Sequence, residues 1–436
     1  MSELPPKVAI IGGGYAGLAA AVTLAAQRVP VTLYEAAATL GGRARRVDIN
    51  GVALDNGLHI LIGAYRETLR LVAQVNPHPE QVMQRLPLDW HIHQRLHLQA
   101  PRLPAPLHLL GALLLAKGVS MRERFSALRM MHALRRAKFQ LTADTTVSAL
   151  LASHRQGHAL SHYLWGPLCV AALNTPPETA SAQLFLNVLR DGLNADRAGS
   201  DLIIARTDLT ALFPQPAATY VGDRGGTVLT STRVTSLRAD VAGFVLDADG
   251  TQKAFSHVIC ALPPHQVCAF LQNFDALADA RKMIASLSYQ PITSVYLQFD
   301  GAVHLPSPML GLADGPAHWL FDREALCGQR GLIGAVISAE GSHQNLTQDA
   351  LAAQLHETLI AKFGALPALQ WQRVITEKRA TFSAVPGLQR PLQRTPHKNL
   401  WLAGDYTASD YPATLEAAVR SGIACAQGIL SHAAAL

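Results

Sequence analysis

A glycine pattern near the start of the chain has the residue types and spacing that bind phosphate. Gly12, Gly14 and Gly17 follow a short apolar run, VAII, and precede an alanine-rich segment. The first glycine permits a tight turn, the second lets the backbone approach a pyrophosphate, and the third lets a helix pack closely on a strand. The unpaired N–H groups at the helix N-terminus then face the phosphates. The pattern predicts a dinucleotide site, with Tyr15 and Ala16 in the same loop.

The elements that must hold this loop can be read on either side of it. VAII (8–11) reads as a buried parallel strand, and residues 17–27 read as a helix. A second strand, VPVTLYE, ends in Glu35, where a carboxylate can accept hydrogen bonds from a ribose 2′-hydroxyl. An acid at this position argues against a 2′-phosphorylated nucleotide. The nucleotide could be an exchanging nicotinamide or a resident flavin.

A second glycine pair follows, in LGGRARR (40–46). Gly42 lets the backbone pass close to a ligand, and Arg43 can neutralise a pyrophosphate oxygen. The alternative is an ordinary glycine turn with solvated arginines. A simple nicotinamide-binding domain has no need of such a pair, so this segment favours a flavin.

The far end of the chain distinguishes the two nucleotides. Residues 400–422 read as a strand, a turn at Gly404 and Asp405, and a helix from about Thr414. Asp405 can accept hydrogen bonds from a sugar-alcohol chain, and N–H groups near Leu415 can face a carbonyl that becomes negative on reduction. A flavin has both groups, in its ribityl chain and its C2 oxygen. The sequence therefore predicts resident FAD.

Taken together, these motifs and the segment 222–264 resemble the superfamily of flavin-containing amine oxidases and phytoene desaturases. The resemblance implies an α/β fold in which a Rossmann-like FAD-binding domain, of the GR2 type of flavoprotein, is interleaved with a substrate domain of mixed sheet and helices. It also implies that the backbone of Val234 contacts the adenine. One departure is Ala417, where the family commonly has glycine, and this puts the flavin contacts at that turn in doubt.

The resemblance divides the chain into interleaved parts. The FAD-binding domain is expected at 1–70, 215–270 and 395–436, and the substrate domain at 71–214 and 271–394. Within the substrate domain, we expect helices over most of 110–200, strands within 290–340 and 371–382, and an amphipathic helix over 345–363.

Residues outside the flavin motifs indicate the substrate. The family's amine oxidases use a lysine near the flavin, on a strand of the substrate domain. No lysine occurs from Met283 through Ala361, which covers those strands, so an amine is disfavoured as the substrate. Four other stretches resemble hydroxysqualene dehydroxylases of squalene and hopanoid synthesis: DNGLHILIGAYRETLRL (55–71), LPAPLHLLGALL (103–114), LWGPLCVAALNTPPETASAQLFLNVLRDGL (164–193) and DLTALFP (208–214). This resemblance implies a long apolar isoprenoid substrate. The alternatives are a carotenoid-type desaturase and a non-catalytic prenyl-binding escort.

The implied reaction is the reductive removal of an allylic hydroxyl, which needs a proton donor and a source of electrons. His59 is the candidate donor because the resemblance places DNGLH near the flavin ring; the alternative is a histidine that is simply hydrogen-bonded in the interior. Gly328, Gly331 and Gly334 have the wrong spacing for a second nucleotide loop. We therefore expect an external electron donor, either a reduced nicotinamide nucleotide or a protein.

Composition excludes several classes of protein. The chain has 436 residues, of which 49% are hydrophobic and 16% charged, so it can bury a large core and is not disordered. Five scattered cysteines without a CxxC argue against a disulfide framework or a zinc site, and favour the cytoplasm. The net charge is +6, but no nucleic-acid-binding module is present. We expect no metal and no nucleic-acid partner.

Two segments raise the question of a membrane. The 19 residues from Val8 to Ala26 carry no charge, but the glycine spacing favours strand, turn and helix over a membrane span. An apolar segment from Leu103 to Gly118 precedes residues 117–138, which hold seven basic residues against one acid. This region, 103–138, is either a peripheral contact with the inner face of the cell membrane or a core helix followed by a solvated one.

Overall fold

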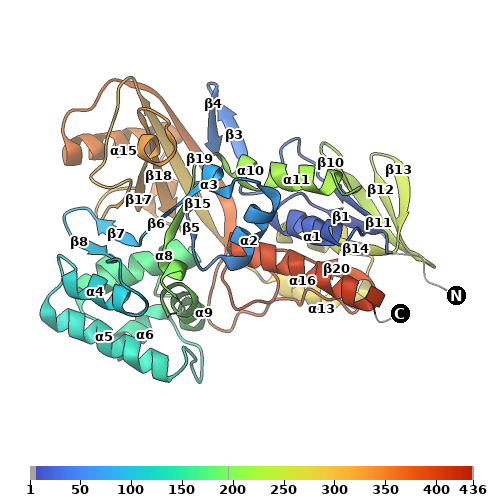
Figure 1. Ribbon diagram of the computed structural model, residues 1–436, viewed down its shortest axis with the longest axis horizontal. Helices are drawn as coiled ribbons and strands as arrows, with labels where there is room; N and C mark the ends of the chain where they lie inside the picture. The colour runs from blue at the N-terminus through green and yellow to red at the C-terminus, as the bar shows by residue number, and fades with distance from the viewer. Residues whose placement is uncertain (1–5, 195, 435–436) are drawn as a thin grey trace.

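A five-stranded parallel sheet leads into the glycine loop in the computed structural model of Figure 1. The structure describes residues 6–194 and 196–434. In order across the sheet, the strands are β10 (Thr227–Leu229), β2 (Val31–Tyr34), β1 (Val8–Ile11), β14 (His257–Cys260) and β20 (Leu400–Leu402). All neighbouring strands are parallel. The sheet thus joins strands from all three segments expected to bind the nucleotide, whereas the domain boundaries stay a prediction.

Two helices, α1 (Tyr15–Ala26) and α16 (Leu415–Ala434), pack on each other beside this sheet (Figure 1). The small side chains of α1 allow close packing all round it, and most of its residues are buried. The closest approach is at Gly422, where a Cβ atom would lie 2.0 Å from the Ala16 carbonyl oxygen. A third helix, α11 (Pro214–Gly222), also packs on α1. The charge-free stretch from Val8 is therefore β1, the glycine loop and α1, as expected.

A small antiparallel sheet lies in the chain between β10 and β14. Its strands are β11 (Val234–Asp240), β12 (Gly243–Ala248) and β13 (Thr251–Phe255). Residues along β12 are alternately buried and partly exposed, as in a sheet with one face on the core. Figure 1 shows these strands at the same end of the molecule as the parallel sheet.

A seven-stranded mixed sheet forms the centre of the second half of the molecule. Its order is β19 (Leu369–Phe382), β15 (Tyr289–Phe299), β18 (Leu332–Ser338), β17 (Trp319–Asp322), β16 (Met309–Gly311), β7 (Asp89–Ile92) and β8 (Leu96–Gln99). The helix α15 (Gln348–Phe363) packs on β15 and β19. The strands expected within 290–340 and 371–382 and the amphipathic helix over 345–363 are confirmed.

Helices dominate residues 107–194, as expected (Figure 1). They are α4 (Leu107–Leu115), α5 (Met121–Arg136), α6 (Val147–Ser153), α7 (His158–Leu160), α8 (Gly166–Leu173) and α9 (Ala182–Leu189), with π-helical turns at Ser161–Trp165 and Arg190–Asn194. The other helices are α2 (Arg66–Val75), α3 (Pro79–Val82), α10 (Leu209–Leu212), α12 (Pro264–Phe270), α13 (Ala278–Ala285) and α14 (Arg323–Cys327). None of the helices within 6–194 and 196–434 is long and apolar enough to cross a membrane.

Several short strands connect the two halves. A two-stranded ladder is formed by β3 (Arg46–Ile49) and β4 (Val52–Asp55), and a three-stranded sheet has the order β5 (Leu61–Ile62), β9 (Leu202–Ala205) and β6 (Met83–Leu86). The central strand β9 pairs on both sides with antiparallel neighbours that are far from it in sequence. These pairings hold the segment after the glycine loops against the helical region.

Candidate functional site

The glycine loop requires glycine at its first and third positions. Gly12 has φ +112°, and a Cβ atom there would lie 2.5 Å from the Ala261 carbonyl oxygen. A Cβ atom at Gly17 would lie 2.0 Å from the carbonyl oxygen of Gly12. Both distances are well below van der Waals contact, so a larger side chain at either position would force the strand and the helix apart. The turn and the close packing inferred from the sequence are both present.

The N-terminus of α1 is open to an anion. Gly14 is the residue that precedes the helix, and no side chain caps the helix there. The first turn, with Tyr15 and Ala16, contains no acid that could neutralise the partial positive charge of the helix end. Backbone N–H groups with these properties bind phosphate. A Cβ atom at Gly14 would meet only the Cα of Gly42, at 3.9 Å, so the loop is bare at this point.

Glu35 holds the glycine loop in shape. One oxygen of its carboxylate accepts a hydrogen bond from the N–H of Gly13 at 2.7 Å, and the other accepts one from the N–H of Ala37 at 2.8 Å. A carboxylate can accept about four hydrogen bonds, so two of its positions remain for the hydroxyls of a ribose. The expected role of Glu35 fits this geometry and stays a prediction.

The second glycine pair lies directly on the first loop. Gly41 donates its N–H to the carbonyl of Gly13 at 2.9 Å, and a Cβ atom at Gly42 would lie 3.3 Å from the Cα of Gly14. Both residues have positive φ, +118° and +62°. The two backbones are therefore in contact, which only glycines permit. The pair is part of the nucleotide loop and not an isolated surface turn.

Arg43 connects the second glycine pair to the end of β20. Its guanidinium donates to the Asp405 carboxylate at 2.7 Å and to the carbonyl of Ala380 at 2.6 Å. Burial alone would lower the pKa of Arg43, but the Asp405 carboxylate outweighs this effect and the pKa is raised. Gly404 precedes the buried Asp405, and a Cβ atom on it would overlap the ring of Tyr406. An ion pair thus joins the first and third segments.

The N-terminus of α16 is the third part of the candidate FAD site, after the glycine loops and the Arg43–Asp405 pair. The Thr414 hydroxyl accepts a hydrogen bond from the N–H of Ala417 at 3.1 Å and caps the helix that starts at Leu415. Ala417, the departure from the family pattern, is buried and fits the turn without strain. The helix therefore begins where the sequence indicated. Its N-terminal dipole can stabilise negative charge near Leu415.

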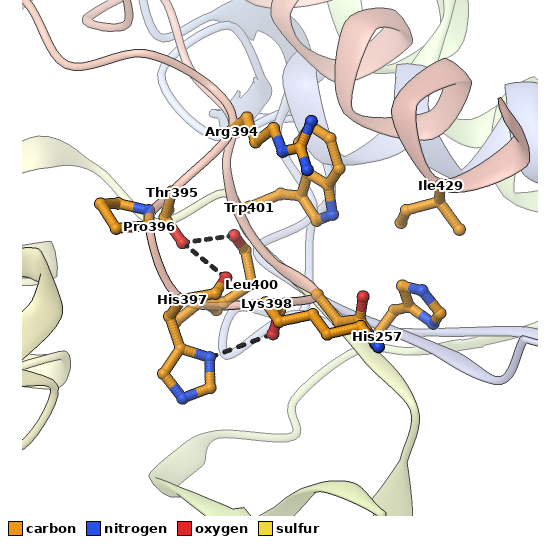
Figure 2. A pocket seen from close by; sticks show the side chains of 10 residues that line it. His257, Arg394, Thr395, Pro396, His397, Lys398, Leu400, Trp401 and Ile429 are labelled. Carbon is orange, nitrogen blue, oxygen red and sulfur yellow. Dashed lines mark hydrogen bonds between the residues drawn. The ribbon is translucent and has the colours of Figure 1, made fainter. Parts of the chain in front are cut away.

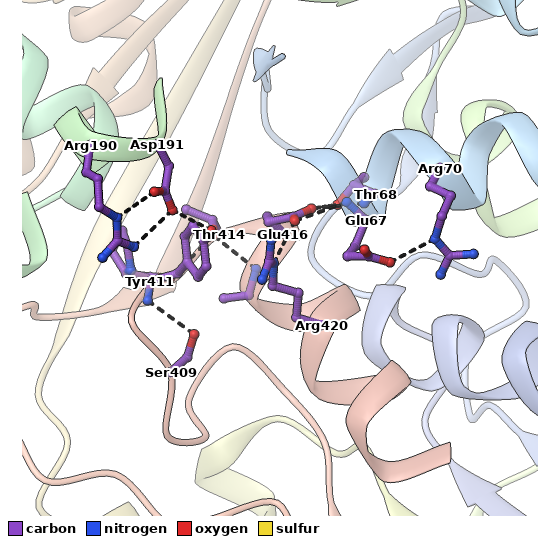
Figure 3. Close-up of polar contacts among 12 residues, drawn as sticks. Glu67, Thr68, Arg70, Arg190, Asp191, Ser409, Tyr411, Thr414, Glu416 and Arg420 are labelled. Atoms are coloured by element: carbon purple, nitrogen blue, oxygen red, sulfur yellow. Dashed lines mark hydrogen bonds and ion pairs between the residues drawn. The ribbon is translucent and has the colours of Figure 1, made fainter. Parts of the chain in front are cut away.

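Glu416, in the first turn of α16, is bound from several directions at once (Figure 3). Its side chain is fully buried and accepts hydrogen bonds from the N–H groups of Glu67 (3.1 Å) and Thr68 (2.9 Å) and from the Thr68 hydroxyl (2.8 Å). Arg420 donates to it at 2.7 Å from the next turn of α16. The carboxylate therefore caps α2 and locks that helix onto α16. No local pattern around Glu416 indicated this partner.

Comparison with known proteins agrees with this geometry. The family model described as flavin-containing amine oxidoreductase matches residues 15–430. The chain belongs to that family. A hydroxysqualene dehydroxylase of Sinorhizobium fredii is 28% identical over 445 residues, covering 98% of this chain and 99% of its own. One of Zymomonas mobilis is 27% identical, covering 97% and 99%, and a zeta-carotene desaturase of Synechocystis is 26% identical, covering 99% and 98%.

Solved structures share the fold over nearly the whole chain. A cyclohexylamine oxidase from Brevibacterium oxydans has a TM-score of 0.71 at 17% identity, covering 98% of this chain and 99% of its own. A putative protoporphyrinogen oxidase from Exiguobacterium has a TM-score of 0.70 at 14% identity, covering 99% and 100%. The expected α/β flavoprotein fold and the full-length resemblance are confirmed. The protein is an FAD-dependent oxidoreductase.

The residues at the site fit FAD. The bare glycine loop and the uncapped N-terminus of α1 suit the pyrophosphate, because they offer N–H donors with no competing acid nearby. Glu35 follows β2 and is bonded to the glycine loop, and its carboxylate suits the ribose. Asp405 follows β20 and is bonded to Arg43, and its carboxylate suits the ribityl chain. Val234 starts β11 at a register shift in the ladder, where the pairing with β12 is irregular. The individual contacts to FAD stay predictions.

The side chain of Tyr15 is buried and bonded within the protein. Its hydroxyl donates to the carbonyl of Leu209 at 3.0 Å, and its ring packs on Phe213 at 5.2 Å between centroids. Burial raises the pKa of this phenol far above its usual range. The side chain thus anchors the glycine loop to α10. The predicted cofactor contact of Tyr15 would use its N–H, and it stays a prediction.

His59 is bonded to the backbone of its own turn and has a lowered pKa. Its Nδ1 is 2.7 Å from the carbonyl oxygen of Gly57, so this nitrogen carries the proton and Nε2 is left as an acceptor. Burial lowers the pKa of His59, and the nearby Arg43 cation lowers it further, although the hydrogen bond to Gly57 opposes both effects. Its role as a proton donor stays a prediction, and it would require the imidazolium form.

The loop that precedes α16 carries a polar cluster that sequence reasoning missed (Figure 3). The Tyr411 hydroxyl donates to Asp191 at 2.6 Å, and Arg190 donates to the same carboxylate at 2.6 Å. Burial alone would raise the pKa of Asp191, but these hydrogen bonds lower it. Asn174 has a structural role, because its buried amide donates to the Pro291 carbonyl and the Thr381 hydroxyl and accepts from the N–H of Ala339.

A separate cavity of about 140 Å³ lies at the amino ends of β14 and β20 (Figure 2). The hydroxyl of Thr395 is within hydrogen-bonding distance of the carbonyls of His397 (3.0 Å) and Leu400 (2.7 Å) in its wall. The glycine loop follows the carboxyl end of β1 in the same parallel sheet, so the cavity is at the opposite edge. It is therefore separate from the glycine loops.

Proposed function

We propose that this protein removes the hydroxyl group of hydroxysqualene reductively and releases squalene, as a step of squalene or hopanoid synthesis. The full-length similarity to hydroxysqualene dehydroxylases carries this proposal, together with four stretches outside the flavin motifs that resemble them. The absence of lysine from Met283 through Ala361 supports a substrate other than an amine.

The reaction balances as the replacement of a hydroxide by a hydride. A proton joins the allylic hydroxyl, the C–O bond breaks, and water leaves a cation that is delocalised over the neighbouring double bond. Reduced FAD, when bound, supplies the hydride that forms the new C–H bond. The substrate gains two electrons, which an external donor must return to the protein. That donor is a reduced nicotinamide nucleotide or a reduced protein.

The chain's own residues would bind and orient the reactants. The glycine loop and the Arg43–Asp405 pair would hold the cofactor in one position, since the pair joins two segments at 2.7 Å. Delivery of the proton is the task we assign to His59, which is partly buried and close enough to Arg43 for that cation to lower its pKa. All five cysteines are free thiols, which supports a place in the cytoplasm, and we propose contact with the inner face of the cell membrane.

Anaerobic turnover tests the proposal. The FAD-loaded protein, reduced chemically, should convert hydroxysqualene to squalene, while the oxidised protein should not. Product chromatography after both incubations measures this. Formation of a desaturated product from phytoene by the oxidised protein, with hydroxysqualene left unchanged, would favour the carotenoid-type alternative. A purified protein that refuses FAD would favour the prenyl-binding escort.

The pH dependence of turnover tests His59 separately. Because the pKa of His59 lies below its usual range, a proton delivered by its imidazolium would make single-turnover rates rise as pH falls below neutrality. His59→Gln should abolish this rise, while His78→Gln, an exposed histidine elsewhere, should leave the profile unchanged. Identical profiles for wild type and His59→Gln would remove His59 from the reaction without affecting the proposed substrate.

A further inference from the structure

Exposed apolar side chains are concentrated in one short part of this chain. Eleven large hydrophobic side chains are exposed among residues 6–194 and 196–434, and seven of them lie between positions 103 and 125. These seven are Leu103, Leu107, Leu110, Leu114, Leu115, Met121 and Phe125. We call them, with the helices that carry them, the α4–α5 surface. Single exposed hydrophobic residues need no explanation, but a contiguous group of this size marks an interaction site.

The leucines of α4 form a regular outward stripe. Leu107, Leu110 and Leu114 are spaced by three and four residues and share one side of the helix. The opposite side is fixed to the protein, because His108 is fully buried, with its Nε2 3.2 Å from the Ser200 hydroxyl. The helix is therefore anchored along one side and presents leucines to the outside along the other. Such an outward stripe has no partner within the described chain.

The connection between α4 and α5 makes the surface a single unit. Arg124 of α5 donates to the carbonyls of Leu114 and Ala116 at the C-terminus of α4. A side chain in this position satisfies carbonyls that the helix end leaves free. Ser120 and Glu123 form a capping box that fixes the start of α5 in the same corner. The exposed side chains of the two helices are thus held in a fixed relation.

The charge of the α4–α5 surface is strongly positive. Arg102, Lys117, Arg122 and Arg129 are exposed around the apolar side chains, and no ion pair found within the described residues involves any of them. The single acid of the region, Glu123, is already bonded internally to Ser120 and to the N–H of Ala159. This single acid offsets one basic charge, so the region keeps a large net positive charge.

We propose that the α4–α5 surface docks on a lipid bilayer with anionic headgroups. Apolar side chains would enter the boundary of the acyl chains while the surrounding basic side chains meet the headgroups, which is the arrangement of helices that lie in a membrane interface. The helix α4, Leu107–Leu115, is too short to cross a bilayer, so it would lie along the surface. A second copy of the chain fits less well, because face-to-face docking would bring the same cations together.

The position of this surface is compatible with an active flavoprotein. Figure 1 shows α4 and α5 at the end of the molecule remote from the parallel sheet and the two chain termini. Docking there would leave the glycine loops and the N-terminus of α16 unobstructed. The inference rests on exposure and charge alone, and it does not depend on which isoprenoid the enzyme reduces.

Vesicle flotation of the FAD-loaded protein tests this docking. Wild type should float with vesicles that contain phosphatidylglycerol, float less with phosphatidylcholine alone, and be released by salt. Leu115→Glu combined with Phe125→Glu should weaken binding by at least about 100-fold, since the burial of each of the two side chains contributes at least about tenfold. Lys117→Glu combined with Arg122→Glu should weaken it by at least about 25-fold, since each basic residue contributes about fivefold.

A matched control separates this surface from general stickiness. Val241 and Leu392 are as exposed as the chosen residues, at 105% and 68%, but lie elsewhere. Val241→Glu combined with Leu392→Glu should bind vesicles as wild type does, and all variants should retain their flavin content. The proposal fails if wild type does not float, or if the control loses binding to the same extent. It also fails if wild type forms a dimer that the Leu115 and Phe125 variant abolishes, without any vesicle binding.

Discussion

Replacement of Glu416 by alanine should lower the thermal stability of the protein. The replaced side chain is fully buried, so no exposed side chain changes. The carboxylate is fully buried and receives hydrogen bonds from two backbone N–H groups of α2, from the Thr68 hydroxyl and from Arg420. Alanine removes all four acceptor contacts at once. The N-terminus of α2 then loses its cap in an environment that water does not reach, and Arg420 loses its partner.

The size of the loss can be worked out from these contacts. Each buried donor that loses its acceptor costs about 1 to 3 kcal/mol, and the three donors of α2, in the lower part of that range, cost about 3 to 5 kcal/mol together. Arg420 is 39% exposed and can return to water, so the cost comes mainly from the donors of α2. The entropy of unfolding is about 2.1 cal/mol/K per residue, or roughly 0.9 kcal/mol/K for the 436 residues of this chain. The expected decrease in Tm is therefore about 3 to 5 °C.

Differential scanning fluorimetry of the FAD-loaded and FAD-free proteins measures this decrease. The matched control is Glu67→Ala, on the same turn of α2, where the carboxylate pairs with Arg70 at 2.8 Å and is partly exposed. A surface pair of this kind contributes about 1 kcal/mol or less, so Tm should fall by about 1 °C. Equal decreases for Glu416→Ala and Glu67→Ala would refute the claim that Glu416 locks α2 onto α16.

Gly17→Ala would place a Cβ atom 2.0 Å from the Gly12 carbonyl oxygen and distort the glycine loop. The purified variant should therefore contain little flavin, measured by its absorbance, and full flavin content would contradict the close packing of the loop. Asp405→Asn weakens a 2.7 Å contact with Arg43, and FAD should dissociate at least about tenfold faster, since a charged hydrogen bond contributes about 1.5 to 3 kcal/mol; flavin fluorescence after dilution measures the rate. Burial raises the pKa of Asp55 from 3.8 to about 6, so its stabilising contribution is complete below the unfolded value and is lost as pH rises through about 6. The Tm advantage of wild type over Asp55→Asn should therefore shrink between about pH 4 and about pH 6 and stay level above that range, and a constant difference would show that Asp55 titrates normally.

The cofactor loops could be predicted because their signals are local. Gly12 and Gly17 stand where a tight turn and a close helix contact exclude a Cβ atom, and such requirements act within a few residues. The start of α16 at Leu415 and the end of β2 at Tyr34 were recognisable for the same reason. The long helix α15 was predicted from its apolar period, which depends only on its own sequence.

The contacts that fix these loops could not be predicted, because they join distant residues. Arg43 and Asp405 are 362 positions apart, and Thr68 and Glu416 are 348 apart. A carboxylate in a first helical turn looks the same in sequence whether it faces water or caps another helix. The strand β9, Leu202–Ala205, was missed because an apolar run of four residues has no period that separates a strand from a buried helix.

The same distant contacts predict that the FAD loops and the rest of the molecule are energetically coupled. Tyr15 is held by Leu209, which lies in the segment assigned to the substrate domain, and Arg43 is held by Ala380, which lies in the other such segment. Because the loop geometry depends on these partners, loosening of the substrate-side elements must lower the affinity for FAD. By linkage, bound FAD must in turn stabilise those elements. A division of the sequence into two interleaved domains is therefore not a division into two units of independent stability.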